Sequence, residues 1–368
     1  MELARASIMS KTVLIPCPLC RSEKGFRANN TDKDLHIKKY GELYAGLAKS
    51  EWRVCGNCGF VHQNPRPSAD DLNRFYLNSK YHPADNSEAW ENAENYLEFA
   101  RWYYDEKIDY ALKTSGLKQG AVFDVGFGQG GVLKLFANRG WQAYGVESDK
   151  TLLEYAKKKL GLGLIQEGIL HSRTEFKTKV DLVFSNHTFE HIADLHDAMV
   201  GLRKVLKPGS YVFTAIPTYY KNRSSLSLEW MNSAHYSMFT HNSLNQLFSH
   251  YGLEEVTHTY RGWHKEIDDL WHLAKFTGKV ADPKAFYENP DEVRRYVNTI
   301  NPVRSLVCYP LYSDYARRVE FYRSIKNRIT SLPNSHHARM LSYYTRTLLT
   351  SPRQSIRKAA LRLKKKEV

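Results

Sequence analysis

A glycine cluster between an apolar strand and an amphipathic helix constrains this sequence more than any other feature. The apolar run Ala121–Val125 predicts a buried strand, and residues 130–139 repeat apolar side chains at helical spacing. Between them, Gly126, Gly128 and Gly130 allow the backbone to turn sharply and to approach a ligand without an intervening side chain. The N-terminus of the following helix offers N–H groups to such a ligand. The segment therefore predicts a strand–turn–helix unit that binds a ligand through its backbone.

From residue 119 onward the chain alternates short apolar segments with amphipathic ones, which is typical of a parallel sheet covered by helices on both faces. The predicted strands are Ala121–Val125, Gln142–Glu147, Leu164–Gln166, Val180–Ser185 and Tyr211–Ile216, with a last one within Ile267–Phe276. The predicted helices between them are Gly130–Arg139, Lys150–Leu160 and Leu195–Val205. We therefore expect a doubly wound, Rossmann-like α/β domain.

At 368 residues, the chain is long enough for one large core and a small satellite. We expect four parts. Residues 13–67 carry paired cysteines and end at nearby prolines, and residues 68–118 form a helical lead-in that starts with a cap at Ser68. Residues 119–278 form the α/β domain, and residues 279–368 form a helical, basic extension.

Four of the five cysteines occur as two Cys-x-x-Cys pairs, Cys17 with Cys20 and Cys55 with Cys58. Four thiolates in two such pairs match the ligands of a tetrahedral structural zinc ion, and they leave no open position for catalysis. The 34 residues between the pairs are more than a compact zinc ribbon needs. A redox dithiol is the alternative. In either case the cysteines indicate a reducing compartment, and we expect the cytoplasm.

Acidic residues flank the glycine cluster. Asp124 precedes it, and Glu147 ends the next predicted strand, where a carboxylate can accept hydrogen bonds from both hydroxyls of a ribose. The glycine spacing of Gly126, Gly128 and Gly131 also fits a nicotinamide dinucleotide fingerprint. Asp124 argues for a ligand with an ammonium group instead, and the cluster follows about a hundred residues of other structure instead of opening the chain.

Residues 121–260 resemble the class I S-adenosylmethionine-dependent methyltransferase family. The resemblance includes the glycine cluster, the segment 180–192 with its Glu-His pair, the turn at 206–209, and the segment 235–253. It implies that Asp124, Gly126, Gly128 and Gly130 hold the methionine part of the cofactor, that Glu147 binds its ribose, and that Asn186 lies near the sulfonium. Glu167 is the best candidate for a contact with adenine. Ser210 stands where the family usually has a second glycine.

The cysteine pairs, the Asn-Pro-Arg-Pro segment at 64–67 and the tyrosine-rich lead-in resemble a subset of bacterial methyltransferases, many of them found with enzymes of surface-sugar biosynthesis. This extends the resemblance over residues 17–275 and implies S-adenosylmethionine and structural zinc as cofactors. Transfer of a methyl group to a hydroxyl is helped by a general base, and histidine suits that role best near neutral pH. The candidates are His187, His191 and His235.

The net charge of +14 favours an anionic partner, and part of it lies in residues 351–368, with seven basic residues against Glu367. No run of eighteen apolar residues occurs, which argues against a membrane-spanning helix. We therefore expect a methyltransferase that O-methylates a sugar, glycan or other small molecule. The alternatives are an RNA methyltransferase that grips phosphates with its zinc unit and basic surface, a non-catalytic cofactor-binding scaffold, and a nicotinamide oxidoreductase.

Overall fold

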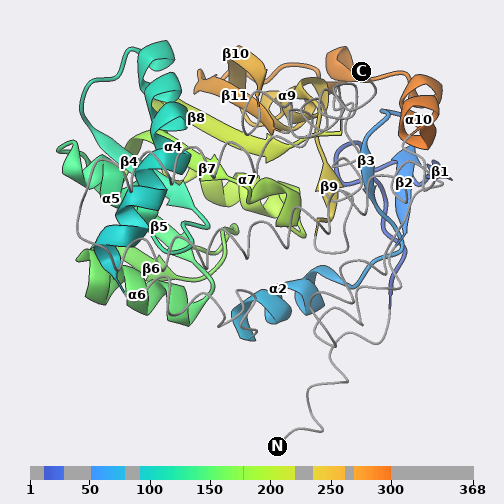
Figure 1. Cartoon of the computed structure of the whole chain (residues 1–368). Helices are drawn as coiled ribbons and strands as arrows, with labels where there is room; N and C mark the ends of the chain where they lie inside the picture. The colour runs from blue at the N-terminus through green and yellow to red at the C-terminus, as the bar shows by residue number, and fades with distance from the viewer. Residues whose placement is uncertain are drawn as a thin grey trace, which may run out of the picture. The chain divides into compact units, whose positions relative to one another are not determined.

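The structure of the chain is a computed structural model that describes residues 12–28, 51–78, 92–176, 178–219, 235–261 and 269–299. All of these residues belong to one compact unit (Figure 1). The basic segment 351–368 and most of the expected C-terminal extension lie outside the described residues. Among the helices that the structure describes, none combines the length and the apolar character needed to cross a membrane.

A seven-stranded mixed sheet forms the centre of this unit, with strand order β10-β11-β8-β7-β4-β5-β6. Its parallel strands are β4 (Ala121–Val125), β5 (Gln142–Glu147), β6 (Ile165–Glu167), β7 (Val180–Asn186) and β8 (Leu206–Pro217). Strand β11 (Asp269–Phe276) pairs antiparallel with β8, and β10 (Leu253–Arg261) pairs antiparallel with β11. The chain order reverses between β4 and β7, so that a crevice forms beside the carboxyl ends of these strands.

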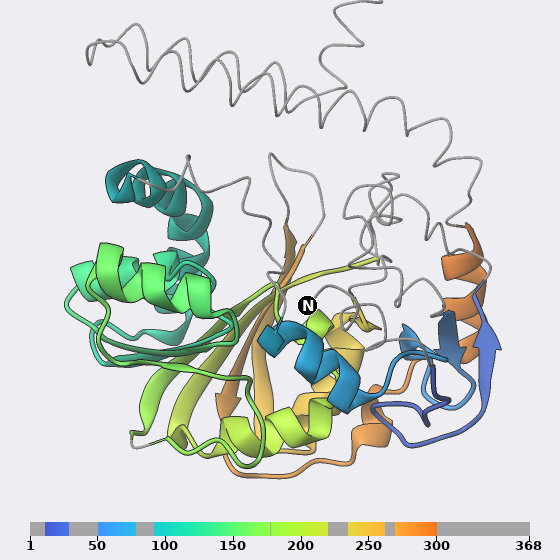
Figure 2. The same cartoon turned by 90° about the horizontal axis from the view of Figure 1, so that it is seen from below.

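Helices cover both faces of this sheet (Figure 2). Side chains alternate along β4: Val122 packs with α4 (Ala93–Ser115), α5 (Gly131–Asn138) and α6 (Lys150–Leu160), whereas Phe123 packs with α7 (Leu195–Arg203) and α9 (His241–Ser249). The expected doubly wound α/β fold is therefore confirmed.

A second, four-stranded sheet of order β1-β2-β3-β9 carries the cysteine pairs. Strands β1 (Gly25–Arg27), β2 (Trp52–Cys55) and β3 (Val61–Gln63) come from the N-terminal part of the chain. The fourth strand, β9 (Ser237–Met238), comes from the segment between β8 and α9 and pairs antiparallel with β3. The N-terminal strands are thus joined by main-chain hydrogen bonds to the segment that links β8 and α9.

The strand predictions need three corrections, the first being that β8 begins at Leu206, five residues before the predicted Tyr211, because Leu206 already pairs with Val180 of β7. The predicted strand Leu164–Gln166 begins one residue later, since Leu164 is exposed and Ile165 is the first side chain to turn into the core. Strand β10 was not predicted at all, because six of its nine residues are polar or charged. It lies at the edge of the sheet, where charged side chains are common.

The lead-in is helical where it is described, in α2 (Ala69–Asn78) and α4. The expected cap of α2 is present, because the Ser68 hydroxyl accepts a hydrogen bond from the Asp71 amide at 3.1 Å. Beyond residue 279 the structure describes a short 3-10 helix, η6 (Pro283–Phe286), and α10 (Pro290–Thr299). The Glu288 amide donates to the Cys58 carbonyl at 3.2 Å, so this segment packs on the cysteine unit.

Candidate active site

A pocket of about 390 Å³ lies at the carboxyl ends of β4, β5, β6 and β7. Its volume is within the usual range for small-molecule sites. The predicted site residues that line it are Gly126, Gly128, Glu147, Asn186, His187 and His191. It also includes residues that the sequence did not single out, among them Asp149 and the loop Gly168–His171.

The glycine loop forms one wall of this pocket. Its sharp turn depends on glycines with left-handed backbone torsions. Gly126, Gly128 and Gly130 have φ angles of 67°, 58° and 86°. A Cβ atom on Gly126 would lie 2.9 Å from the Thr188 methyl group, and one on Gly130 would lie 2.8 Å from Leu162. A Cβ on Gly128 would meet no atom within 4 Å. Gly126 and Gly130 therefore permit close packing, whereas Gly128 leaves open space over the pocket.

The Glu147 carboxylate lies at the end of β5 and is tied to the glycine loop. It accepts hydrogen bonds from the amides of Gly128 at 2.8 Å and Asp149 at 2.9 Å, and from the Ser148 hydroxyl at 3.2 Å. Burial raises the pKa of Glu147, and these hydrogen bonds act against the increase. The carboxylate is therefore fixed in position before any ligand arrives.

Three predicted cofactor residues and one predicted base do not line the pocket. Asp124 is buried within β4, where burial and the nearby Glu147 raise its pKa well above the usual value. Gly130 supports the loop from beneath, and Glu167 forms an ion pair with Lys150 at 3.4 Å. His235 lies behind the wall, where its ring meets that of His191 edge-on at 4.7 Å. The roles predicted for these residues remain predictions.

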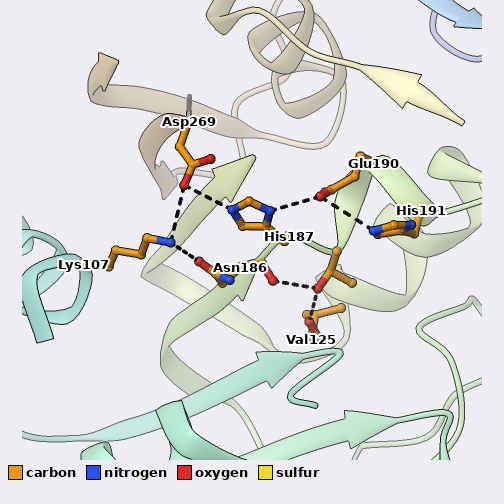
Figure 3. Close-up of polar contacts among 8 residues, drawn as sticks. Lys107, Val125, Asn186, His187, Glu190, His191 and Asp269 are labelled. Carbon is orange, nitrogen blue, oxygen red and sulfur yellow. Dashed lines mark hydrogen bonds and ion pairs between the residues drawn. The ribbon is translucent and has the colours of Figure 1, made fainter. Parts of the chain in front are cut away.

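His187 is at the centre of a polar cluster where β7 ends (Figure 3). Its φ angle of 53° is uncommon for a residue with a side chain, and a hydrogen bond from its amide to the Ala215 carbonyl at 2.8 Å holds this conformation. Its Nε2 atom lies 3.1 Å from Asp269 Oδ2, and its Nδ1 atom lies 3.7 Å from Glu190 Oε1. Backbone geometry thus directs the imidazole between two carboxyl groups.

A buried ion pair supports His187 from the side of β11. Lys107, on the buried face of α4, lies 3.4 Å from Asp269 Oδ2 and donates a hydrogen bond to Asn186 Oδ1 at 2.6 Å. Burial alone would raise the pKa of Asp269, but the charges of His187 and Lys107 and their hydrogen bonds outweigh it and lower that pKa to about 2. Asp269 is therefore ionised near neutral pH and accepts a hydrogen bond from the Nε2–H group of His187.

Glu190, in the 3-10 helix η4 (Phe189–His191), is fully buried on the other side of His187. Among the described residues, neither of its carboxylate oxygens has a hydrogen-bond partner. The nearest basic atoms are Nδ1 of His187 at 3.7 Å and Nε2 of His191 at 3.8 Å. Burial raises the pKa of Glu190 to about 7.

The four predicted zinc ligands lie together. The Sγ atoms of Cys17 and Cys58 are 3.7 Å apart, those of Cys20 and Cys55 are 3.5 Å apart, and all four lie within 4.8 Å of one another. These separations are too long for disulfide bonds. The Asn57 amide donates to Cys55 Sγ at 3.4 Å. The geometry is that of four thiol groups facing one point.

The arrangement described above can be compared with known proteins. Residues 96–258 match the family model described as a methyltransferase domain. The matched residues include all five parallel strands, β4 to β8, and the pocket lies at the end of the sheet where the strand order reverses.

Two curated relatives are similar to part of the chain. The C-methyltransferase NovU of Streptomyces niveus is 28% identical over 154 residues, which are 40% of this chain and 36% of NovU. An uncharacterized methyltransferase of Oceanobacillus iheyensis is 29% identical over 114 residues, 30% of this chain and 52% of that protein. The chain therefore spans only about a third to a half of the length of these relatives.

Solved structures that are similar to part of this chain include a SAM-dependent methyltransferase from Aquifex aeolicus, 19% identical, with a TM-score of 0.37, covering 46% of this chain and 88% of that one. Another is the 1,6-didemethyltoxoflavin-N1-methyltransferase of Burkholderia thailandensis, 14% identical, with a TM-score of 0.43, covering 59% and 96% of the two chains.

Sequence analysis missed Lys107, Asp269 and the burial of Glu190. Lys107 had a usable signal, because it continues the helical stripe of Tyr96 and Ala100 that faces the core, where a charged side chain needs a partner. Asp269 had none, because an aspartate at the start of a strand is common. Their proximity depends on the pairing of β11 with β8.

Proposed function

We propose that this protein is an S-adenosylmethionine-dependent methyltransferase acting on a sugar or another small-molecule acceptor. The observation that carries the proposal is the pocket at the switch point of the methyltransferase domain, where an open glycine turn holds the Glu147 carboxylate in place. When bound, the cofactor supplies an electrophilic methyl group attached to a sulfonium, and the thioether that remains after transfer is a good leaving group.

The pocket residues fit such a cofactor. Glu147 would accept hydrogen bonds from the ribose, as its position at the end of β5 allows, and the open side of Gly128 leaves room for a ligand against the loop. Strand β6 lies next to β5, whereas β7 lies on the far side of β4. The residues Gly168–His171, which follow β6, would therefore hold the adenine ring of the cofactor. Residues 186–191 would then face the acceptor. An intact loop of this kind argues against the alternative of a non-catalytic cofactor-binding scaffold, in which we would expect a damaged loop.

His187 is the candidate general base, because it lines the pocket and has an ordered partner on Nε2. The ionised Asp269 accepts a hydrogen bond from Nε2–H, which leaves Nδ1, on the Glu190 side of the ring, as the basic nitrogen. A carboxylate in this position both fixes the tautomer and stabilises the imidazolium that forms when the acceptor gives up its proton. Lys107 holds Asp269 in place from the opposite side.

The acceptor is therefore a group that loses a proton on methylation. A hydroxyl of a sugar or small molecule is the first candidate. The second is an acidic carbon next to a carbonyl group, and similarity to a protein named as a C-methyltransferase favours it.

The four cysteines would hold a structural zinc ion. Zinc–sulfur bonds of about 2.3 Å in a tetrahedron separate the sulfur atoms by roughly 3.8 Å. The distances of 3.5 and 3.7 Å between the paired Sγ atoms are close to this value. The ion would join the two Cys-x-x-Cys turns, and no step of the chemistry passes through it.

The first test is calorimetric titration of the full chain with S-adenosylhomocysteine, with NADH as the control ligand. We expect micromolar binding of S-adenosylhomocysteine and none of NADH. Binding of NADH alone, or of neither ligand, would contradict the proposed function. If the expected result is obtained, methylation of nucleotide sugars and glycans with a labelled methyl donor then identifies the acceptor.

A further inference from the structure

The environment of Glu190 is not explained by the fold. Its side chain is fully buried, and among the described residues no donor reaches either carboxylate oxygen within hydrogen-bond distance. Buried acceptors are nearly always paired, since an unpaired one loses its hydration without compensation. The buried cation nearest to this cluster, Lys107, is already paired with Asp269 and Asn186. A carboxyl group in this situation requires a proton or a cation.

Two histidines supply the other donors of a cation site. One ligand atom each from Glu190, His191 and His235 lie within 4.8 Å of one another, and Glu190 Oε1 is 3.8 Å from His191 Nε2. Ligand bonds of about 2.0–2.2 Å place donor atoms roughly 3–3.5 Å apart, so a small contraction around an ion would complete the site. Two imidazoles and one carboxylate are a donor set suited to first-row transition metals.

The main chain holds these donors in one place. The Tyr236 amide donates to the Glu190 carbonyl at 2.7 Å, which ties the segment after His235 to η4. On the other side, Gln63 Nε2 donates to the His235 carbonyl at 2.6 Å. These two hydrogen bonds fix the backbone from which the side chains of Glu190 and His235 project.

We propose that Glu190, His191 and His235 form a binding site for a divalent transition-metal ion at the edge of the pocket. Three protein ligands leave coordination positions open, and His191 lines the pocket, so the open positions face the acceptor side. An oxygen of the acceptor, either the hydroxyl to be methylated or a carbonyl beside an acidic carbon, would bind there and lose its proton more readily. This role of the ion rests on the proposed methyl transfer, whereas the binding site itself does not.

The test is a metal count on the full chain. Wild-type protein is equilibrated with buffered zinc at low micromolar free concentration, and bound zinc is measured by atomic emission. We expect two zinc ions per chain, one held by the four cysteines and one by the new site. Glu190→Gln should bind one, and zinc affinity at the second site should fall at least about tenfold. His191→Gln, whose side chain is 17% exposed, is the second variant in case Glu190→Gln does not fold.

A matched control comes from a histidine–glutamate pair elsewhere. His258 Nδ1 lies 2.6 Å from Glu255 Oε1, and His258→Gln should still bind two zinc ions. Equal zinc counts in wild type and in folded Glu190→Gln would overturn the proposal. That result would mean that a proton, and not a metal ion, neutralises Glu190. Titration of the same samples with S-adenosylhomocysteine separates the two proposals, since loss of the second zinc ion leaves the cofactor pocket intact.

Discussion

Replacement of Asp269 by asparagine tests the polar cluster without knowledge of the acceptor. The side chains of Asp269 and Lys107 are 5% and 4% exposed, so their charges interact with little screening. The pKa of Asp269 falls from its usual 3.8 to about 2, and each pKa unit corresponds to about 1.4 kcal/mol. The ionised carboxylate therefore contributes about 2 kcal/mol to the free energy of unfolding at neutral pH.

The loss in Asp269→Asn should be somewhat larger than this contribution. Asparagine keeps the shape of the side chain but leaves the buried ammonium group of Lys107 without its counter-charge, and breaking a buried pair costs about 3–5 kcal/mol. In a Lys107→Met background the same substitution leaves no orphaned charge. In that background we expect Asp269→Asn to lower the free energy of unfolding by at least about 1–2 kcal/mol less than in wild type. This difference is the coupling energy between Asp269 and Lys107.

The assay is urea denaturation followed by circular dichroism at constant zinc. An exposed ion pair of the same length serves as the control: Lys150 and Glu167 also lie 3.4 Å apart, with side chains 71% and 42% exposed. Glu167→Gln should cost less than about 1 kcal/mol. If Asp269→Asn has an equally small effect, or the same effect with and without Lys107, the described electrostatics of the cluster are wrong.

The pH dependence follows from the depressed pKa of Asp269. Its stabilising contribution is complete above its unfolded-state pKa of 3.8 and is lost as pH falls from there through about 2. The stability difference between wild type and Asp269→Asn should therefore be constant above about pH 5 and should shrink below pH 4. A difference that grows on acidification would contradict an ionised Asp269.

Three further substitutions test the cofactor pocket and the cysteine unit. Gly128→Ala should lower the free energy of unfolding by roughly 1–2 kcal/mol through backbone strain, and it should weaken S-adenosylhomocysteine binding at least about tenfold. The control is Gly161→Ala, because Gly161 has a similar φ of 68° and equally open surroundings but lies outside the pocket. This variant should show the same loss of stability without the loss of affinity. Glu147→Gln should weaken the same binding by about 10–100-fold in calorimetry, because hydrogen bonds to a carboxylate contribute about 1.5–3 kcal/mol; unchanged affinity would exclude a ribose contact. Cys55→Ser should release zinc, measured by atomic emission, and lower the unfolding temperature, and a wild-type protein that is equally stable without metal would contradict a structural zinc ion.

The parts of the fold that could be predicted are those specified by local patterns. Strand β4 has four apolar residues and Asp124 and is followed by a glycine, and both predicted ends of Ala121–Val125 are confirmed. Helix α6 also has the predicted bounds, since Asp149 caps its N-terminus and Gly161 ends it in a left-handed conformation. In each case the residues that set the ends are neighbours in the sequence.

Features that depend on contacts between distant residues could not be predicted. Strand β10 is polar because only one face of this edge strand is covered, so its sequence has no apolar run. The Lys107–Asp269 pair joins residues 162 positions apart through a helix and a strand with no common motif. Glycine clusters and paired cysteines identify chemistry locally, whereas an ion pair is specified only by the completed sheet.

The cysteine unit, predicted as a separate domain, supports residues beside the candidate base from behind the pocket. Strand β3 pairs with β9, Gln63 binds the His235 carbonyl, and the Arg66 guanidinium donates to the Ala193 carbonyl next to the pocket. Arg66 is 4% exposed and burial lowers its pKa to about 10, so it remains charged at neutral pH and this contact is costly to break. If zinc organises the cysteine unit, its removal should therefore disturb the acceptor side of the pocket before the cofactor side, because the hydrogen bonds described for the unit reach Ala193 and His235 and not Gly128 or Glu147.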